Sequence, residues 1–474
     1  MPADGVNPTD DATSAWNPQF YEPPVSEIPS VDGMGVRDLR PMTTTQEEVH
    51  GTWWLPTEPD RVAAGTLRLQ HGARPRLEVH VPLVDPVTEE HAEESTFTVH
   101  GQSGGQHVTL LNAVAIESQV ERQVATGKQY IHQVLQADTG ALIGREHIDD
   151  ADHKMFAEAF IEVDYLTFLA KSADPTWSER ETQQGATTAT FVIPLAAELS
   201  AQFGGLKATL TTRETYTGEQ AYGIGGTSIP VTYRAIFRLQ GDAPMAVQQF
   251  STAARELSDL VTLGMLRPAH VRRIDFDAAP GSANDRYRWW GTDPMPREEI
   301  LGFETRRNIA FTFLDADLAT MLPAWNALLT TARYGVGSTI ALLRETSTYH
   351  ETKLLGVCGA LEALCRGLGL QGTYRQRAEA LAGIVAPTVR VEVIPSVDKW
   401  AEYLTKARNS LAHGDEPEDR KVPEDVWYAL EHPTLALLIL VLMTKLGVSE
   451  KAQRLALNYK GLRTAASLGT RYLT

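Results

Sequence analysis

An arginine and a histidine stand five positions apart in the segment ARNSLAHGD, residues 407–415. His413 is the only neighbouring side chain whose ordinary pKa lies near neutrality, so it can take up or release a proton at pH 7. Arg408 offers a planar cationic fork that suits a phosphate or a developing negative charge. Read alone, the pair has a simpler explanation, because a cation in the last turn of a helix is stabilised by about a few tenths of a kcal/mol.

The segment belongs to a helix predicted over residues 397–413. Ser396 is placed to cap its start, Asp398 lies in the first turn, and Gly414 follows the last residue. A single apolar stripe runs along it at helical spacing, made of Trp400, Tyr403, Leu404, Ala407 and Leu411. At about 100° per residue, Arg408 and His413 point about 140° apart on an ideal helix. This geometry favours a composite site in which two copies of the helix meet.

Bulk composition sets limits on the protein class. The chain has 474 residues, 43% of them hydrophobic and 22% charged, with a formal net charge of -17, which indicates a globular protein of two or three domains. An acidic surface repels phosphate backbones, so any contact with nucleic acid must come from a local basic patch. Cys358 and Cys365 are spaced too far apart on one helical face for a disulfide, which suits a reducing compartment.

Targeting and membrane signals are weak. Residues 1–20 combine neither a basic region nor an apolar stretch, so they do not read as a signal peptide. The apolar run Thr434–Met443 has about half the length of a membrane span and is predicted to form a buried helix. We therefore expect a cytoplasmic protein without a membrane partner.

Periodicity divides the chain into a β-rich and a helical part. Alternating apolar residues predict strands at 77–84 and 231–240, with further candidates at 107–113, 188–193 and 206–212. Helical spacing begins near residue 244 and dominates from 313, with helices expected at 315–332, 336–368, 374–385, 397–413, 424–446 and 450–458. The fold class is thus α+β, with a β-sandwich or irregular barrel followed by an all-α bundle.

Four segments follow from this pattern. Residues 1–45 are predicted to form a mobile or draped arm, 46–275 the β-rich domain, 276–312 an ordered connector, and 313–474 the helical bundle. Trp289 and Trp290 lie in the connector, and we expect both to be buried.

The C-terminal pattern Arg408-Asn409-Ser410-Leu411-Ala412-His413 resembles the HEPN superfamily (higher eukaryotes and prokaryotes nucleotide-binding), whose ribonuclease members carry arginine, a polar residue and a histidine in this order. Two segments resemble the start of the ApeA N-terminal domain, VHGTWWLPTEPDRVAAGTLRL (49–69) and FTVHGQSGGQHVTLLNA (97–113). Together, over about residues 46–445, they are similar to the ApeA family of anti-phage abortive-infection proteins.

The resemblance implies an endoribonuclease that works without metal or cofactor. The ribose 2′-OH would attack the adjacent phosphate and leave a 2′,3′-cyclic phosphate. Arg408 and His413 would be the catalytic residues, with Asn409 in support. It further implies an RNA substrate, a phage-derived trigger, and a β-rich domain that senses infection or restrains the nuclease. A homodimer is expected from the composite site that the geometry of the helix favours.

Other charged residues near this helix have weaker assignments. Glu362 lies in an apolar stripe, where a carboxylate needs a partner; it is expected to pair with Arg408 or a helix end, or else to tune the proton affinity of His413. Lys451, Arg454 and Lys460 form part of a basic C-terminal segment that either faces RNA or is simply solvated. The acidic stretch 414–419 would repel RNA, which suits a restrained nuclease.

Alternative interpretations remain open at the sequence level. The HEPN bundle could serve only as an RNA- or nucleotide-binding or dimerisation module, in which case Arg408 and His413 would be dispensable. The β-rich domain could instead bind carbohydrate or peptide. His147 and His153 stand among aspartates, but their spacing matches no common metal motif, so a solvated loop is preferred.

Overall fold

The computed structural model describes residues 46–70, 73–84, 96–122, 129–170, 176–181, 187–192, 198–216, 221–223, 226–228, 231–278, 286–291, 309–345, 349–413 and 424–474. All of these belong to one compact unit, Thr44–Thr474. The predicted arm, residues 1–45, and the acidic stretch 414–419 lie outside the described residues.

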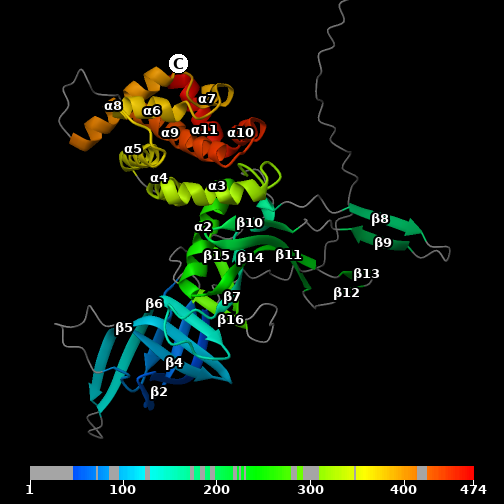
Figure 1. The fold of residues 1–474 in the computed structure, drawn as a ribbon, viewed down its shortest axis with the longest axis vertical. Helices are drawn as coiled ribbons and strands as arrows, with labels where there is room; N and C mark the ends of the chain where they lie inside the picture. The colour runs from blue at the N-terminus through cyan, green and yellow to red at the C-terminus, as the bar shows by residue number, and fades with distance from the viewer. Residues whose placement is uncertain are drawn as a thin grey trace, which may run out of the picture. The chain divides into compact units, whose positions relative to one another are not determined.

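The first part of the chain closes into a barrel (Figure 1). Its six strands are β1 (Gln46–Leu55), β2 (Glu58–Gln70), β3 (Arg76–Val79), β4 (Phe97–Ser103), β5 (Gln106–Arg122) and β6 (Gln129–Gly144). They pair antiparallel in the order β6-β3-β2-β1-β4-β5, and β5 pairs again with β6. The predicted strand 77–84 is shorter than expected, because pairing ends at Val79.

Trp53 fills the barrel interior and is fully buried. Its ring needs the space that glycine leaves at position 101, where a Cβ would meet the ring at 2.2 Å. Leucines and valines of β2 to β6 complete this core, which is separate from the larger core of the protein. The motif containing Trp53 therefore specifies barrel packing.

The sheet continues beyond the barrel through β6. The C-terminal end of β6 pairs with β16, and the outer strands follow in the order β16-β15-β7-β14-β11-β10. Their bounds are β7 (Phe156–Val163), β10 (Leu199–Phe203), β11 (Leu206–Tyr216), β14 (Val231–Met245), β15 (Val271–Asp277) and β16 (Arg286–Gly291). Two small hairpins, β8 (Thr176–Glu181) with β9 (Thr187–Val192) and β12 (Ala221–Gly223) with β13 (Gly226–Ser228), pair separately.

Two helices accompany the outer strands, α1 (Leu166–Leu169) and α2 (Val247–Met265). The stretch read as a connector, 276–312, contains the end of β15 and all of β16. Trp289 and Trp290 are 7% exposed, which confirms their expected burial.

The C-terminal part is helical, and its bounds are α3 (Leu318–Thr331), α4 (Arg333–Arg344), α5 (His350–Gly367), α6 (Tyr374–Ala382), α7 (Pro387–Val393), α8 (Val397–His413), α9 (Glu424–Lys445), α10 (Glu450–Leu457) and α11 (Lys460–Tyr472). The single helix predicted over 336–368 is wrong, because α4 ends at Arg344 and α5 begins at His350. Helices α7 and α11 were not predicted. The α+β class, with a β-rich part before a helical part, is confirmed.

Helix α9 is the centre of this bundle. Its window Val426–Lys445 has the length and hydropathy of a membrane span, but 72% of it is buried inside the protein. Leu437 to Met443 are at most 2% exposed, and α9 packs against α5 and α11. The prediction that the apolar run is a buried core helix is confirmed.

Candidate active site

Helix α8 is fixed at its start and along its apolar face. The backbone N–H of Lys399 donates to Ser396 Oγ at 3.3 Å, so Ser396 caps the helix as predicted. Trp400 is fully buried, and its indole N–H donates to Thr434 Oγ1 of α9 at 2.9 Å. Leu404 and Ala407 are also fully buried, which confirms the predicted stripe and sets the rotation of the helix. Arg408, next to Ala407, is therefore held at the edge of the buried face.

Arg408 is anchored by side chains from two other helices. Its guanidinium carbon lies 5.8 Å from the centre of the Tyr374 ring on α6, within cation–π distance. One terminal nitrogen donates to Asn409 Oδ1 at 3.2 Å. The other lies 3.9 Å from Glu362 Oε2 on α5, which is an ion pair without a hydrogen bond. The side chain of Arg408 remains 34% exposed.

Glu362 is shared among three arginines. Its strongest partner is Arg377 of α6, whose terminal nitrogen donates to Glu362 Oε1 at 3.1 Å. Arg366, one turn later on α5, lies 3.8 Å from the same oxygen. The expected pairing with Arg408 is thus present, but it is the longest of the three. Glu362 ties α5, α6 and α8 together at this point.

Tyr374 and Arg377 were missed by the sequence reasoning. Thr373 and Gln376 form a capping box that marks the start of α6, but this signal does not reveal which helix Tyr374 will meet. Burial raises the pKa of the Tyr374 hydroxyl well above its ordinary value. Burial also raises the pKa of the neighbouring Cys358 thiol to about 11. Both groups are thus neutral at pH 7, and the charge of the cluster comes from Glu362 and the arginines.

His413 is the last residue of α8, and its side chain lies outside the described residues. The helix stays regular from Arg408 to His413, so the positions remain about 140° apart around its axis. Whether Glu362 affects His413 therefore stays a prediction, as do the catalytic roles of Arg408, Asn409 and His413.

Only some basic side chains of the C-terminal segment have a charge that is free to contact RNA in the described structure. Lys451 is exposed on α10. Arg454 lies 3.6 Å from Glu392 and donates to the Thr388 carbonyl at 3.3 Å, so part of its charge is compensated. Lys460 begins α11, and its side chain lies outside the described residues. An RNA-facing role for the three stays a prediction.

The histidines of the acidic loop at 145–154 do not share an environment. His153 is exposed and pairs with Asp149 at 3.7 Å, as a solvated loop implies. His147 turns inward, stacks on His100 with ring centres 4.2 Å apart, and meets the ring of His107 at 4.6 Å. Burial, together with the neighbouring His100 and His107, lowers the pKa of His147 to about 4. Across the described ranges, no group of three His, Cys, Asp or Glu residues is arranged to hold a metal ion.

Comparison with known proteins identifies both parts of the chain. No curated protein and no solved structure matches it. The family model for ApeA N-terminal domain 1 matches residues 48–325, more than half of the chain, and the model for Apea-like HEPN matches residues 357–452. The second match contains Glu362, Arg408 and His413. The chain therefore belongs to the ApeA family, with an ApeA N-terminal domain 1 followed by an Apea-like HEPN domain.

Proposed function

We propose that this protein is an anti-phage defence ribonuclease, which halts growth of the infected cell by cutting RNA without a metal ion. Family membership supports the defence role and the nuclease type of the C-terminal domain. The observation that carries the site assignment is the setting of Arg408: its guanidinium is anchored by Tyr374 and Glu362, yet a third of the side chain is exposed. An anchored, solvent-facing arginine fork is pre-organised for a phosphate.

The proposed reaction is an internal transfer of the phosphoryl group. The ribose 2′-oxygen loses its proton and forms a bond to the adjacent phosphorus, while the bond from phosphorus to the 5′-oxygen breaks and that oxygen gains a proton. The products carry a 2′,3′-cyclic phosphate and a 5′-OH. Arg408 stabilises the added negative charge on the phosphorane oxygens, and His413 moves a proton. Asn409, which accepts a hydrogen bond from Arg408, holds the fork in place.

The reaction supports a homodimeric site. Two protons must move, and each chain offers one histidine in this motif. Because Arg408 and His413 lie about 140° apart around α8, one copy does not turn both toward the same phosphate. Two copies of α8, packed near their C-terminal ends, would supply two histidines and two arginines to one site.

The test compares purified wild type with Arg408→Ala, Arg408→Lys and His413→Ala. Lys406→Ala is the matched control, because Lys406 lies on the same helix in an exposed pair with Glu402 at 2.7 Å. We expect the two alanine variants to lose RNA cleavage and the lysine variant to lose most of it, since a point charge cannot replace the fork. EDTA should leave cleavage unchanged, and a substrate with 2′-deoxyribose at the cut site should be bound and left intact.

Two outcomes would contradict the proposal. Full cleavage by Arg408→Ala and His413→Ala would reduce the motif to a helix end. RNA binding without cleavage by the wild type, with equal phage protection by every variant, would favour the binding or dimerisation module instead. The cellular assay scores growth arrest and RNA integrity with and without phage.

The β-rich part is proposed to hold the nuclease in check until a phage-derived trigger arrives. Its contact with the helical part supports this role. Arg344 at the end of α4 lies 2.8 Å from Asp259 of α2 and donates to the Ala269 carbonyl at 3.1 Å. Arg344 thus joins the β-rich part to α4, which packs against α5, the helix that carries Glu362.

A further inference from the structure

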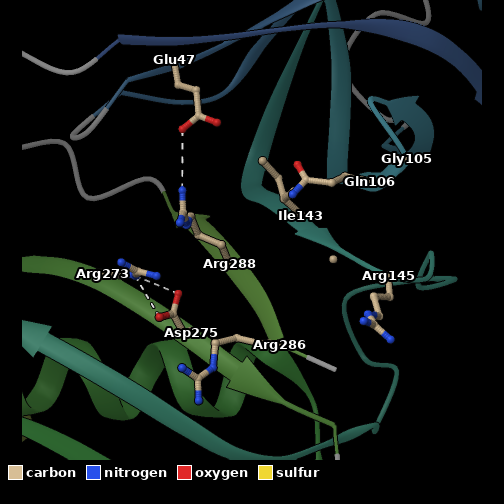
Figure 2. Close-up of a pocket in the computed structure, with 10 residues that line it drawn as sticks. Glu47, Gly105, Gln106, Ile143, Arg145, Arg273, Asp275, Arg286 and Arg288 are labelled. Atoms are coloured by element: carbon tan, nitrogen blue, oxygen red, sulfur yellow. Dashed lines mark hydrogen bonds and ion pairs between the residues drawn. The ribbon is translucent and has the colours of Figure 1, made fainter. Parts of the chain in front are cut away.

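A cavity of about 410 Å³ lies where the barrel meets the outer strands (Figure 2). Glu47 of β1 and Arg145, which follows β6, come from the barrel side. Arg273 and Asp275 of β15 and Arg286 and Arg288 of β16 come from the outer strands. In Figure 2, Arg273 and Arg145 lie on opposite sides of the space, and Arg288 extends toward Glu47.

The cavity is basic in an acidic protein. Four arginines and two carboxylates line it, whereas the whole chain carries a formal net charge of -17. A concave site that gathers one sign of charge concentrates its field and attracts ligands of the opposite sign. The excess of arginine over carboxylate therefore makes this cavity a candidate anion site in the described β-rich part.

The arginines differ in how firmly they are engaged. Arg286 is held by Asp277, with two N–H donors at 3.1 and 3.3 Å from the carboxylate oxygens. Arg273 bonds to Asp275 through Nε at 2.9 Å, an arrangement that leaves its two terminal nitrogens for other acceptors. Within the described residues, Arg288 forms a loose ion pair, with Nη1 3.8 Å from Glu47 Oε2, and its side chain is 46% exposed. Arg273 and Arg288 thus present donors from neighbouring strands.

We propose that this cavity binds a small phosphate-bearing ligand of nucleotide size. Guanidinium forks match the paired oxygens of phosphate, and the buried partners Asp275 and Asp277 fix two of them in position. The volume lies within the range of about 300–1,000 Å³ that is typical of small-molecule sites, and a polymer would need a longer groove. Glu47 forms an ion pair with Arg288 when the ligand is absent, and this pair breaks when phosphate binds to Arg288.

This inference goes beyond the nuclease activity and does not depend on it. Its site lies in the β-rich part, and its test measures binding to the whole protein. A failure of cleavage by the HEPN domain would therefore leave it unaffected.

The experiment is isothermal titration calorimetry of the full chain with pyrophosphate and with ATP, in magnesium-free buffer at two salt concentrations. Arg288→Gln should weaken binding of both probes by about tenfold or more, the usual cost of one charge-assisted hydrogen bond. Arg74→Gln is the matched control, since Arg74 forms an exposed pair with Asp138 at 2.7 Å on the barrel and does not line the cavity. It should bind as the wild type does.

A second pair of variants separates the site from overall charge. Glu47→Gln should tighten binding, because it removes a repelling carboxylate and releases Arg288. Glu58→Gln neutralises an exposed carboxylate that is paired with Arg61 on β2, and it should leave binding of both probes unchanged. Equal binding by all four variants, or binding only of a single-stranded RNA oligonucleotide and of neither small probe, would overturn the proposal. Thermal melts check that each variant folds, which is expected because Arg288 and Glu47 are both nearly half exposed.

Discussion

Arg408 shows how a surface cation becomes a positioned one. Exposed arginines sample many rotamers, and holding one costs side-chain entropy of about 1.5–2 kcal/mol. Here the ring of Tyr374 and the carboxylate of Glu362 restrict the rotamers of Arg408. Part of the side-chain entropy is therefore lost on folding and not when RNA binds. Tyr374 is thus proposed as a positioning residue, because it acts through Arg408.

The role of Tyr374 can be tested with two substitutions. Tyr374→Leu removes the aromatic face and should lower kcat for RNA cleavage by about 3- to 30-fold, in line with a cation–π contact of about 0.5–2 kcal/mol. Tyr374→Phe keeps the ring and should restore most of the rate, because the cation–π contact with Arg408 uses the face of the ring and not the hydroxyl. Equal rates for the leucine and phenylalanine variants would remove Tyr374 from the site.

His147 gives the barrel a pH-dependent stability. Its folded pKa is about 4 and its ordinary pKa is 6.5, mainly because it is buried against His100 and His107. The unfolded chain therefore binds a proton at higher pH than the folded chain does. Stability is fully present above pH 6.5 and is lost as the pH falls toward 4, by up to about 3 kcal/mol. His147→Gln should flatten this dependence in urea titrations between pH 7.5 and 5.

The control for this prediction is His153→Gln, since His153 is exposed on the same loop. It should retain the wild-type loss of stability with acid. Burial also lowers the pKa of His100, so a residual slope in the His147 variant is expected. An unchanged slope in His147→Gln would show that the cluster does not control acid stability.

At the scale of single elements, local patterns were enough to predict α8 and much of β14. Both have a polar or capping residue at the right place and an unbroken apolar period, and such signals depend only on neighbours in sequence. The break between α4 and α5 was missed because Leu342, Leu343 and Leu354 continue a helical pattern across it. The double use of β6, in the barrel and in the outer sheet, rests on pairings between distant segments and leaves no local signal.

The residues around the candidate site divide in the same way between local signals and tertiary contacts. Arg408, Asn409 and His413 form a motif along one helix, so their sequence spacing is informative. Tyr374 and Arg377 reach this site only because α6 packs beside α5 and α8. Such a contact is a consequence of tertiary packing, which one sequence does not encode in any short pattern.

A buried carboxylate joins α5 to α9. Glu431 is fully buried, 3.1 Å from Lys353 Nζ and 2.8 Å from His350 Nδ1. Lys353→Met removes the main cation and leaves Glu431 in the core with His350 and the more distant His432, 3.9 Å away, so the free energy of unfolding should fall by about 2–4 kcal/mol. Lys406→Met, which breaks an exposed pair, should cost less than about 0.5 kcal/mol. Chemical denaturation measures both, and adding Glu431→Gln to Lys353→Met should recover part of the loss.

The described part of the molecule has two hydrophobic cores that do not follow the two family matches. The barrel encloses the smaller one. The larger one runs from the outer strands and α2 through α3 and into the bundle around α9. Trp325 of α3 is fully buried and donates its indole N–H to the Glu256 carbonyl of α2 at 2.9 Å. The β-rich and helical parts are therefore joined by a core of the kind found within one domain.

Because the larger core spans both parts, we predict that the helical part does not fold stably when it is expressed without the β-rich part. A fragment that begins at residue 301 and carries the helical part would expose the faces of Phe311, Leu318 and Trp325 that pack on the β-rich part. At about 25 cal/mol per Å² of apolar surface, exposing three such side chains costs about several kcal/mol, comparable to the whole stability of many domains. We expect this fragment, expressed alone, to aggregate or to melt well below the intact chain. Expressed together with residues 1–300, it should copurify with them as a complex. A fragment that is monomeric alone and melts at the temperature of the intact chain would show that the helices fold independently, and the β-rich part would then need another means of restraining them.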